Sequence, residues 1–149
     1  MARRGTAGTV FPQPMTNASL APVPSTPLDA RLCRTLVVED DRSSRLALVQ
    51  VLRLSGFEVE SAKTLAEAMA KLKGWLPECI VLDLMLPDGD GSAVLAEIRA
   101  RQLSIRVAVV TASSDADLLC NTAKLRPEAM FTKPIDLSAL LAWLKSASA

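Results

Sequence analysis

Short apolar runs alternate with amphipathic stretches from Cys33 onward, a pattern typical of repeated β-α units. Five of the runs are expected to form strands: Thr35–Val38, Phe57–Glu60, Ile80–Leu82, Ile105–Val110 and Ala129–Thr132. Two amphipathic stretches carry apolar residues at helical spacing, namely Leu65, Ala68, Met69 and Leu72 in one and Leu137, Leu140, Leu141 and Leu144 in the other. Each apolar stripe would cover one face of a sheet.

Helix-end signals support the same division of the chain. Thr64 with Glu67 three residues later is the signature of a capping box, and Asp136 stands where it would cap the last helix. A left-handed residue or a helix breaker belongs near helix ends, where Gly56, Gly74 and Pro127 stand. Strand-helix units joined by right-handed crossovers predict an α/β fold, a doubly wound parallel sheet of five strands with helices on both faces.

The first 30 residues follow no helical or strand period. They contain five prolines among Thr, Ser, Ala and Gly, which predicts a disordered tail over residues 1–30 and one folded domain over residues 33–147. A docking peptide for a partner is the alternative interpretation of the tail, but its Pro12-Gln13-Pro14 pattern is too common to favour it.

The residue inventory excludes several kinds of function. The chain has 17 Lys and Arg against 16 Asp and Glu with no concentrated basic stretch, so we expect no nucleic-acid contact. It has no His, which excludes His-ligated metals, His-dependent nucleophiles and a phosphohistidine on this chain. Its three Cys residues form no CxxC pair, so we expect reduced thiols. No apolar run approaches the roughly 18 residues of a membrane span, and we expect a cytoplasmic protein without a membrane partner.

Acidic, hydroxyl and ammonium side chains follow the predicted strands. Glu39-Asp40-Asp41 comes after the first strand and Asp83 after the third, while Thr111 and Lys133 follow the fourth and fifth. In a doubly wound sheet the ligand site lies beyond the carboxyl ends of the strands, so these side chains are expected to converge. Gathered carboxylates repel each other, and Mg²⁺, which prefers oxygen ligands and keeps positions open for a phosphate, would neutralise them.

This set of residues suits phosphoryl transfer to a carboxylate. Asp83 would attack an electrophilic phosphorus and form an acyl phosphate, with the metal screening charge. Thr111 and Lys133 would each pair with a phosphoryl oxygen. For any one of these residues alone, helix capping or exposure to solvent is the better interpretation. Their occurrence together at successive strand ends favours a shared functional site.

The motifs resemble the receiver domain of response regulators in two-component signalling. Leu36-Val37-Val38-Glu39-Asp40-Asp41 is similar to that family's first strand and acidic pair, and the run from Ile80 to Gly91 resembles its phosphorylation loop. Val109-Val110-Thr111-Ala112 and Phe131-Thr132-Lys133-Pro134 complete the set. The resemblance implies a flavodoxin-like receiver fold with strand order 2-1-3-4-5 and five helices.

Site roles follow from the same resemblance. It implies that Glu39, Asp40 and Asp83 bind Mg²⁺, that Met85 adds its backbone carbonyl, and that Asp83 is the phosphoacceptor. Thr111 and Lys133 would be the other catalytic residues. Asp41 would belong to a helix N-terminus rather than to the site. The Lys133-Pro134 peptide resembles the family's cis bond.

One position departs from the family pattern. Met130 stands three residues before Lys133, where the family often has a Tyr or Phe that switches rotamer. Phe131 is one residue off and should point to the opposite face of the strand, into the core. Phosphorylation is unaffected by this difference, but the readout through an aromatic switch is put in doubt.

The function expected from these observations is a phosphoacceptor rather than an enzyme. The phosphoryl donor would be a sensor histidine kinase or a histidine phosphotransfer protein. As a stand-alone receiver, the chain would act through an unidentified output partner or a phosphorylation-dependent homodimer. A phosphate-independent scaffold is the alternative, although it would not need the full set of polar residues. An aspartyl phosphatase would want a second acid where Met85 stands.

Overall fold

A computed structural model describes residues 32–147 of the chain. Its main sheet has five parallel strands: β1 (Arg34–Val38), β2 (Glu58–Ala62), β3 (Cys79–Asp83), β6 (Arg106–Thr111) and β7 (Ala129–Thr132). Their spatial order is β2-β1-β3-β6-β7. The expected strand order and parallel sheet are confirmed. Strand β7 has the predicted bounds, and the other four strands differ from the apolar runs by one or two residues at one or both ends.

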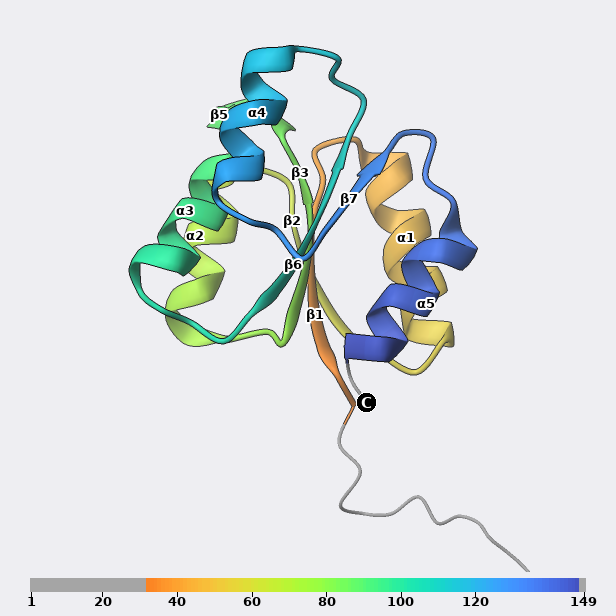
Figure 1. Ribbon diagram of the computed structural model, residues 1–149. Coiled ribbons are helices and arrows are strands. Elements are labelled where there is room, and N and C mark those ends of the chain that lie inside the picture. Colours follow the sequence, from red (N-terminus) through yellow and green to blue (C-terminus); the bar gives the residue numbers. More distant parts are fainter. Residues whose placement is uncertain (1–31, 148–149) are drawn as a thin grey trace, which may run out of the picture. The chain divides into compact units, whose positions relative to one another are not determined.

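Helices cover both faces of the sheet, as Figure 1 shows. They are α1 (Arg42–Leu54), α2 (Leu65–Gly74), α3 (Ser92–Ala100), α4 (Ala116–Lys124) and α5 (Leu137–Ala147). The helices α2, α3 and α4 lie on one face, and α1 and α5 lie on the other (Figure 1). The five-helix prediction is confirmed. A two-stranded antiparallel hairpin of β4 (Met85–Leu86) and β5 (Gly89–Asp90) was not predicted.

The core divides into two clusters, one on each face of the sheet. All five residues of β3 are buried, because this central strand is covered on both sides. In β1, Leu36 and Val38 belong to one cluster while Val37 belongs to the other, as strand alternation requires. On the α5 side, Leu140 and Leu144 are fully buried, and each contributes on the order of 1.5–3 kcal/mol from burial alone.

The helix caps largely agree with the sequence signals. Thr64 accepts a hydrogen bond from the backbone N–H of Glu67, and Asp136 accepts one from Ala139. The carboxylate of Glu67 accepts from the backbone of Lys63 instead of Thr64, one residue earlier than in a standard capping box. Gly56 follows α1 with a φ of 98°, a left-handed conformation that favours glycine.

The predicted tail of residues 1–30 lies outside the described residues, so it stays a prediction. Among the helices in residues 32–147, none combines the length and apolar character needed to cross a bilayer.

Candidate functional site

The residues singled out from the sequence lie at the carboxyl edge of the sheet. Asp83 is the last residue of β3 and Thr111 the last residue of β6, while Glu39 and Lys133 directly follow β1 and β7. Parallel strands have their carboxyl ends on one edge of the sheet. Lys133 therefore contacts Asp83, which is 50 positions away in the sequence, and Glu39, which is 94 positions away.

An acidic cluster occupies this edge. One carboxylate oxygen each from Glu39, Asp40 and Asp83 lies within 4.8 Å of the others. Glu39 and Asp83 are buried, with 5% exposure each, whereas Asp40 is exposed. Two buried carboxylates facing each other need a compensating positive charge.

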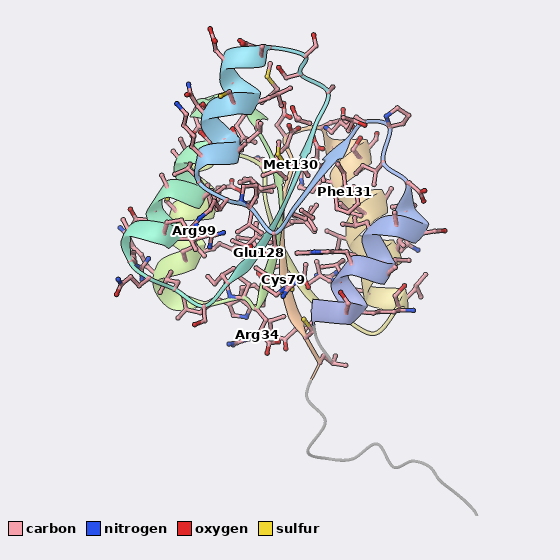
Figure 2. The ribbon with its side chains drawn as sticks, viewed as in Figure 1. Arg34, Cys79, Arg99, Glu128, Met130 and Phe131 are labelled. Atoms are coloured by element: carbon pink, nitrogen blue, oxygen red, sulfur yellow. The ribbon has the colours of Figure 1, made fainter. Side chains whose placement is uncertain are left out.

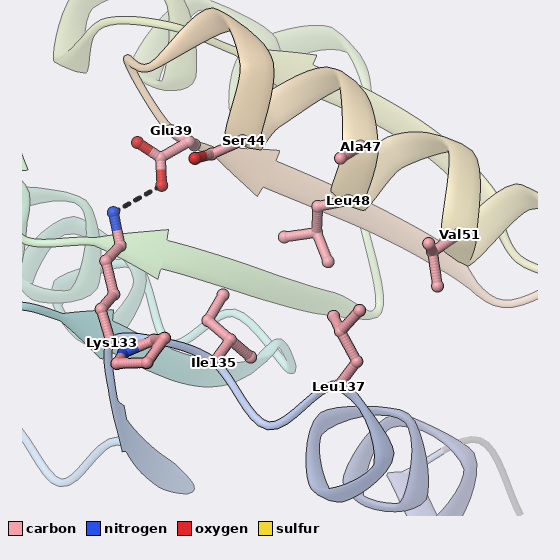
Figure 3. Close-up of a pocket in the computed structure, with 9 residues that line it drawn as sticks. Glu39, Ser44, Ala47, Leu48, Val51, Lys133, Ile135 and Leu137 are labelled. Carbon is pink, nitrogen blue, oxygen red and sulfur yellow. Dashed lines mark hydrogen bonds and ion pairs between the residues drawn. The ribbon is translucent and has the colours of Figure 1, made fainter.

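Lys133 supplies part of that charge. Its Nζ lies 2.7 Å from Glu39 Oε1 and 2.9 Å from Asp83 Oδ2, and Figure 3 shows the bond to Glu39. Burial raises the pKa of Glu39, outweighing the opposing hydrogen bond from Lys133. Burial acts to lower the pKa of Lys133, but its hydrogen bonds to the two carboxylates outweigh this and raise that pKa. The lysine is therefore held in its charged form.

Backbone contacts hold the loop around Asp83, which is part of the run from Ile80 to Gly91 that resembles a phosphorylation loop. The backbone N–H of Met85 donates to Asp83 Oδ1 at 3.0 Å. Gly91 approaches the start of the same loop so closely that an added Cβ would overlap the Asp83 carbonyl and lie 3.0 Å from Leu84 Cα. Only glycine fits this position without displacing the backbone that carries the Asp83 side chain.

The unpredicted hairpin ties this loop to α2. The carboxylate of Asp88 accepts hydrogen bonds from the backbone N–H groups of Leu65 and Ala66 at 2.7 and 3.0 Å. These bonds lower the pKa of Asp88. The Pro87-Asp88-Gly89 sequence is a turn signature that could have indicated the hairpin, but nothing in it indicates the partner helix.

Thr111 is connected to the start of α4 through a series of hydrogen bonds. Its buried hydroxyl accepts from the backbone N–H of Ser113 at 3.0 Å, and the Ser113 hydroxyl accepts from that of Asp115 at 3.1 Å. Asp115 caps α4 by accepting from Asp117 and Leu118. Sequence reasoning missed Ser113 and Asp115, although Ser and Asp ahead of a helix are recognisable cap residues.

Strand β7 orients Met130 and Phe131 oppositely. Met130 is 42% exposed, while Phe131 packs against the core cluster on the α1 and α5 side (Figure 2). The expectation that Phe131 belongs to the core is confirmed. Met130 thus occupies the exposed position beside the sheet edge.

Two further details agree with the resemblance. Asp41 caps α1, accepting from the backbone N–H of Ser44 at 2.8 Å, and is absent from the acidic cluster. The peptide bond between Lys133 and Pro134 is cis.

The donor set fits a hard divalent cation. Glu39, Asp40 and Asp83 offer only carboxylate oxygens, the ligands that Mg²⁺ prefers, and none of the nitrogen or sulfur ligands that favour zinc. Asp40 and Met85 also line an open cavity of about 350 Å³ next to the cluster, which leaves room for water and an incoming phosphate. Magnesium binding by receiver domains is thus compatible with these residues.

Comparison with known proteins identifies the domain. The family model for the response regulator receiver domain matches residues 35–145. The acid tolerance regulatory protein ActR of Rhizobium meliloti is 36% identical over 109 residues, which cover 73% of this chain and 56% of ActR. The transcriptional regulatory protein PrrA of Mycobacterium leprae is 36% identical over 113 residues, covering 76% of this chain and 48% of PrrA. The chain therefore spans about half the length of these relatives.

Solved structures have the same fold. A CheY-like receiver domain protein from Methanospirillum hungatei superposes with a TM-score of 0.74 at 26% identity, covering 78% of this chain and 94% of that one. The non-phosphorylated HemR receiver domain from Leptospira biflexa gives a TM-score of 0.70 at 29% identity, with the same coverage. With the family model spanning most of the described residues, the chain belongs to the response regulator receiver domain family of two-component signalling.

Proposed function

We propose that Asp83 accepts a phosphoryl group from the phosphohistidine of a sensor histidine kinase or a histidine phosphotransfer protein. Glu39, Asp40 and Asp83 would hold Mg²⁺ together with the backbone carbonyl of Met85. Phosphorylation would then change which proteins the domain binds. The observation that carries this proposal is the buried Asp83 carboxylate hydrogen-bonded to Lys133 within an all-oxygen acidic cluster.

The transfer exchanges one bond to phosphorus for another. A carboxylate oxygen of Asp83 forms the P–O bond as the P–N bond to the donor histidine breaks, and the leaving imidazole takes up a proton. When bound, magnesium supplies positive charge between the acidic cluster and the phosphoryl oxygens. Lys133, already 2.9 Å from Asp83 Oδ2, is positioned to pair with one phosphoryl oxygen.

Thr111 would link the phosphoryl group to the conformation of α4. Its hydroxyl oxygen accepts from Ser113, so the hydroxyl proton stays available for a phosphoryl oxygen. A shift of Thr111 toward the phosphoryl group would pull on Ser113 and Asp115 ahead of α4. This route does not require an aromatic residue at Met130.

Output would pass through protein contacts, to an unidentified partner or a second copy of the chain. One relative is named a transcriptional regulatory protein, and the matched 113 residues cover 48% of its length. We propose no nucleic-acid contact for the receiver itself and no enzymatic turnover beyond its own phosphorylation and dephosphorylation. A cytoplasmic location is supported by the free thiols of all three cysteines.

The test is incubation of the full chain with Mg²⁺ and acetyl phosphate, followed by intact mass spectrometry. The wild type should gain one phosphoryl group and Asp83→Asn none. Asp41→Asn is the matched control, because Asp41 lies next to Asp40 but caps α1, and it should be phosphorylated like the wild type. A wild type that gains no mass would favour the phosphate-independent scaffold, and gain in Asp83→Asn would mean that another residue is the acceptor.

A further inference from the structure

Two cysteines lie together at the amino-terminal edge of the sheet, opposite the acidic cluster. Cys79 is the first residue of β3 and pairs with Thr35 of β1. Cys33 stands two residues before Thr35, so strand alternation places its side chain on the same face as that of Thr35. Figure 2 labels Cys79 at this end of the sheet. The fold thus brings together two thiols that are 46 positions apart in the sequence.

The two side chains are direct neighbours. Each thiol shifts the pKa of the other, as expected for two side chains that the β1–β3 register brings together on one face. Both belong to the core on the α1 and α5 side, where Cys79 is 1% exposed and Cys33 is partly buried at the margin. Cys33 is therefore open to a small oxidant, and Cys79 is the thiol within its reach.

We propose that Cys33 and Cys79 are an oxidisable dithiol that a hydroperoxide converts to an intramolecular disulfide. The sulfur of Cys33 attacks the peroxide, whose O–O bond breaks, giving a sulfenic acid and one alcohol or water molecule. The sulfur of Cys79 then attacks the Cys33 sulfur and displaces hydroxide, which leaves as water after protonation. Two S–H bonds are lost, one S–S bond forms, and the peroxide takes up the two electrons.

Burial of the two thiols determines the rate at which the disulfide forms. Burial raises the pKa of the Cys33 thiol, and it raises the pKa of Cys79 to about 12. Because the thiolate is the reactive form, the pair should stay reduced at neutral pH without oxidant and react faster as pH rises. Cys33 precedes the first residue of β1 and takes no part in the β1–β3 ladder, but its carbonyl accepts a hydrogen bond from the backbone N–H of Glu58 in β2. Closing the disulfide therefore requires a small backbone shift at Cys33, which leaves the β1–β3 ladder intact.

The disulfide would join the starts of the two strands that carry the acidic cluster at their other ends. It would close a loop containing β1, α1, β2 and α2, and restricting the unfolded chain in this way should raise the melting temperature. The thiols do not contact Glu39 or Asp83. The proposal is consequently independent of the phosphoacceptor assignment.

The experiment uses the full chain carrying Cys120→Ser, which removes the exposed third thiol. After treatment with hydrogen peroxide, the protein should lose two hydrogen atoms in intact mass and yield a peptide pair linked through Cys33 and Cys79. Its melting temperature should rise and return on addition of dithiothreitol. The rate should increase between about pH 7 and pH 9, as expected for thiolate chemistry.

Cys33→Ser and Cys79→Ser in the same background are the controls, and neither should lose two hydrogen atoms. The proposal is overturned if both thiols remain available to a maleimide after oxidation and denaturation, or if they gain oxygen without forming the linked peptide. Asp83→Asn should oxidise at the same rate as its parent. If no disulfide forms, the proposed phosphorylation of Asp83 is unaffected. If Asp83 is not phosphorylated, the proposed disulfide is equally unaffected.

Discussion

Lys133 Nζ lies 2.9 Å from Asp83 Oδ2 while also contacting Glu39 Oε1 at 2.7 Å. A single ammonium thus neutralises part of the charge of two buried carboxylates that come from different strands. Any added cation must share these carboxylates with Lys133, and any phosphoryl group on Asp83 arrives beside a positive charge that is already in place. Because of these two contacts, we expect loss of Lys133 to affect both the stability of the fold and the rate of phosphoryl transfer.

Lys133→Met should lower the melting temperature in metal-free buffer, because it leaves Glu39 and Asp83 buried without their shared partner. Added Mg²⁺ should recover a larger part of the melting temperature in this variant than in the wild type, since the metal then supplies the missing charge. Thermal unfolding with and without Mg²⁺ measures this. Equal magnesium effects in the two proteins would show that Lys133 and the metal do not share the carboxylates.

The same variant should also slow phosphorylation by acetyl phosphate, on the order of 10²-fold, the usual effect of removing a group that stabilises charge during transfer. The rate is measured by intact mass against time. Lys124→Met, at the end of α4, is the control and should react at the wild-type rate. An unchanged rate in Lys133→Met would remove the lysine from the transfer step.

Met85 should make the acyl phosphate long-lived. Met85 is 57% exposed beside the acidic cluster, and its side chain offers no polar group that could position an attacking water. Met85→Asn should therefore accelerate loss of the phosphoryl group by about tenfold, less than the roughly 10²–10⁴-fold of a positioned acid or base, because an amide orients the water without taking up its proton. Mass spectrometry after removal of the phosphodonor follows the decay. Met130→Asn introduces the same change at another exposed methionine and should not accelerate it; a wild-type half-life of seconds would contradict the prediction.

Gly91 should be intolerant of a side chain. Gly91→Ala forces a Cβ against the backbone of Asp83 and Leu84, and the resulting overpacking should cost about 1–3 kcal/mol in the free energy of unfolding. Gly74→Ala is the matched control, because an added Cβ there meets no atom within 4 Å. Urea unfolding should show the first variant destabilised and the second unchanged or stabilised. Similar stability of the two variants would mean that the loop relaxes freely around residue 91.

Asp88 should contribute a pH-dependent part of the stability. Hydrogen bonds from Leu65 and Ala66 lower the pKa of Asp88 in the folded protein. The contribution is therefore present above the unfolded-state pKa and is lost as pH falls through the lower folded-state value. Asp88→Ala should melt below the wild type at neutral pH, with the difference shrinking in acid. Asp88→Asn keeps an acceptor without a charge, so its difference should be smaller; a constant gap across pH would rule out the charge as the cause.

The sheet and the acidic cluster followed from two simple signals. Alternating apolar runs located the strands, and parallel strands must place their following residues on one edge, which united Asp83 with Glu39 and Lys133. Phe131 could be assigned to the core because neighbouring strand residues face opposite sides. These features depend on periodicity and topology alone.

The contacts that depend on loop geometry could not be predicted in the same way. The two-residue strands of the β4–β5 hairpin are too short for a periodic signal, and the contact of Asp88 with α2 depends on how the loop folds back. The bonds joining Thr111, Ser113 and Asp115 likewise require a specific loop conformation. Sequence patterns specify which residue types are suitable there but not which groups meet.

Chemical trapping locates the phosphoryl group on the chain directly. The chain is phosphorylated with acetyl phosphate in the presence of Mg²⁺, reduced with borohydride to convert an acyl phosphate to an alcohol, and digested for peptide sequencing by mass spectrometry. We expect reduction at Asp83 alone, dependent on Mg²⁺ and strongly diminished in Asp40→Asn. Reduction at Asp40 or another acid, or none in the presence of Mg²⁺, would contradict the assignment of Asp83 as the phosphoacceptor.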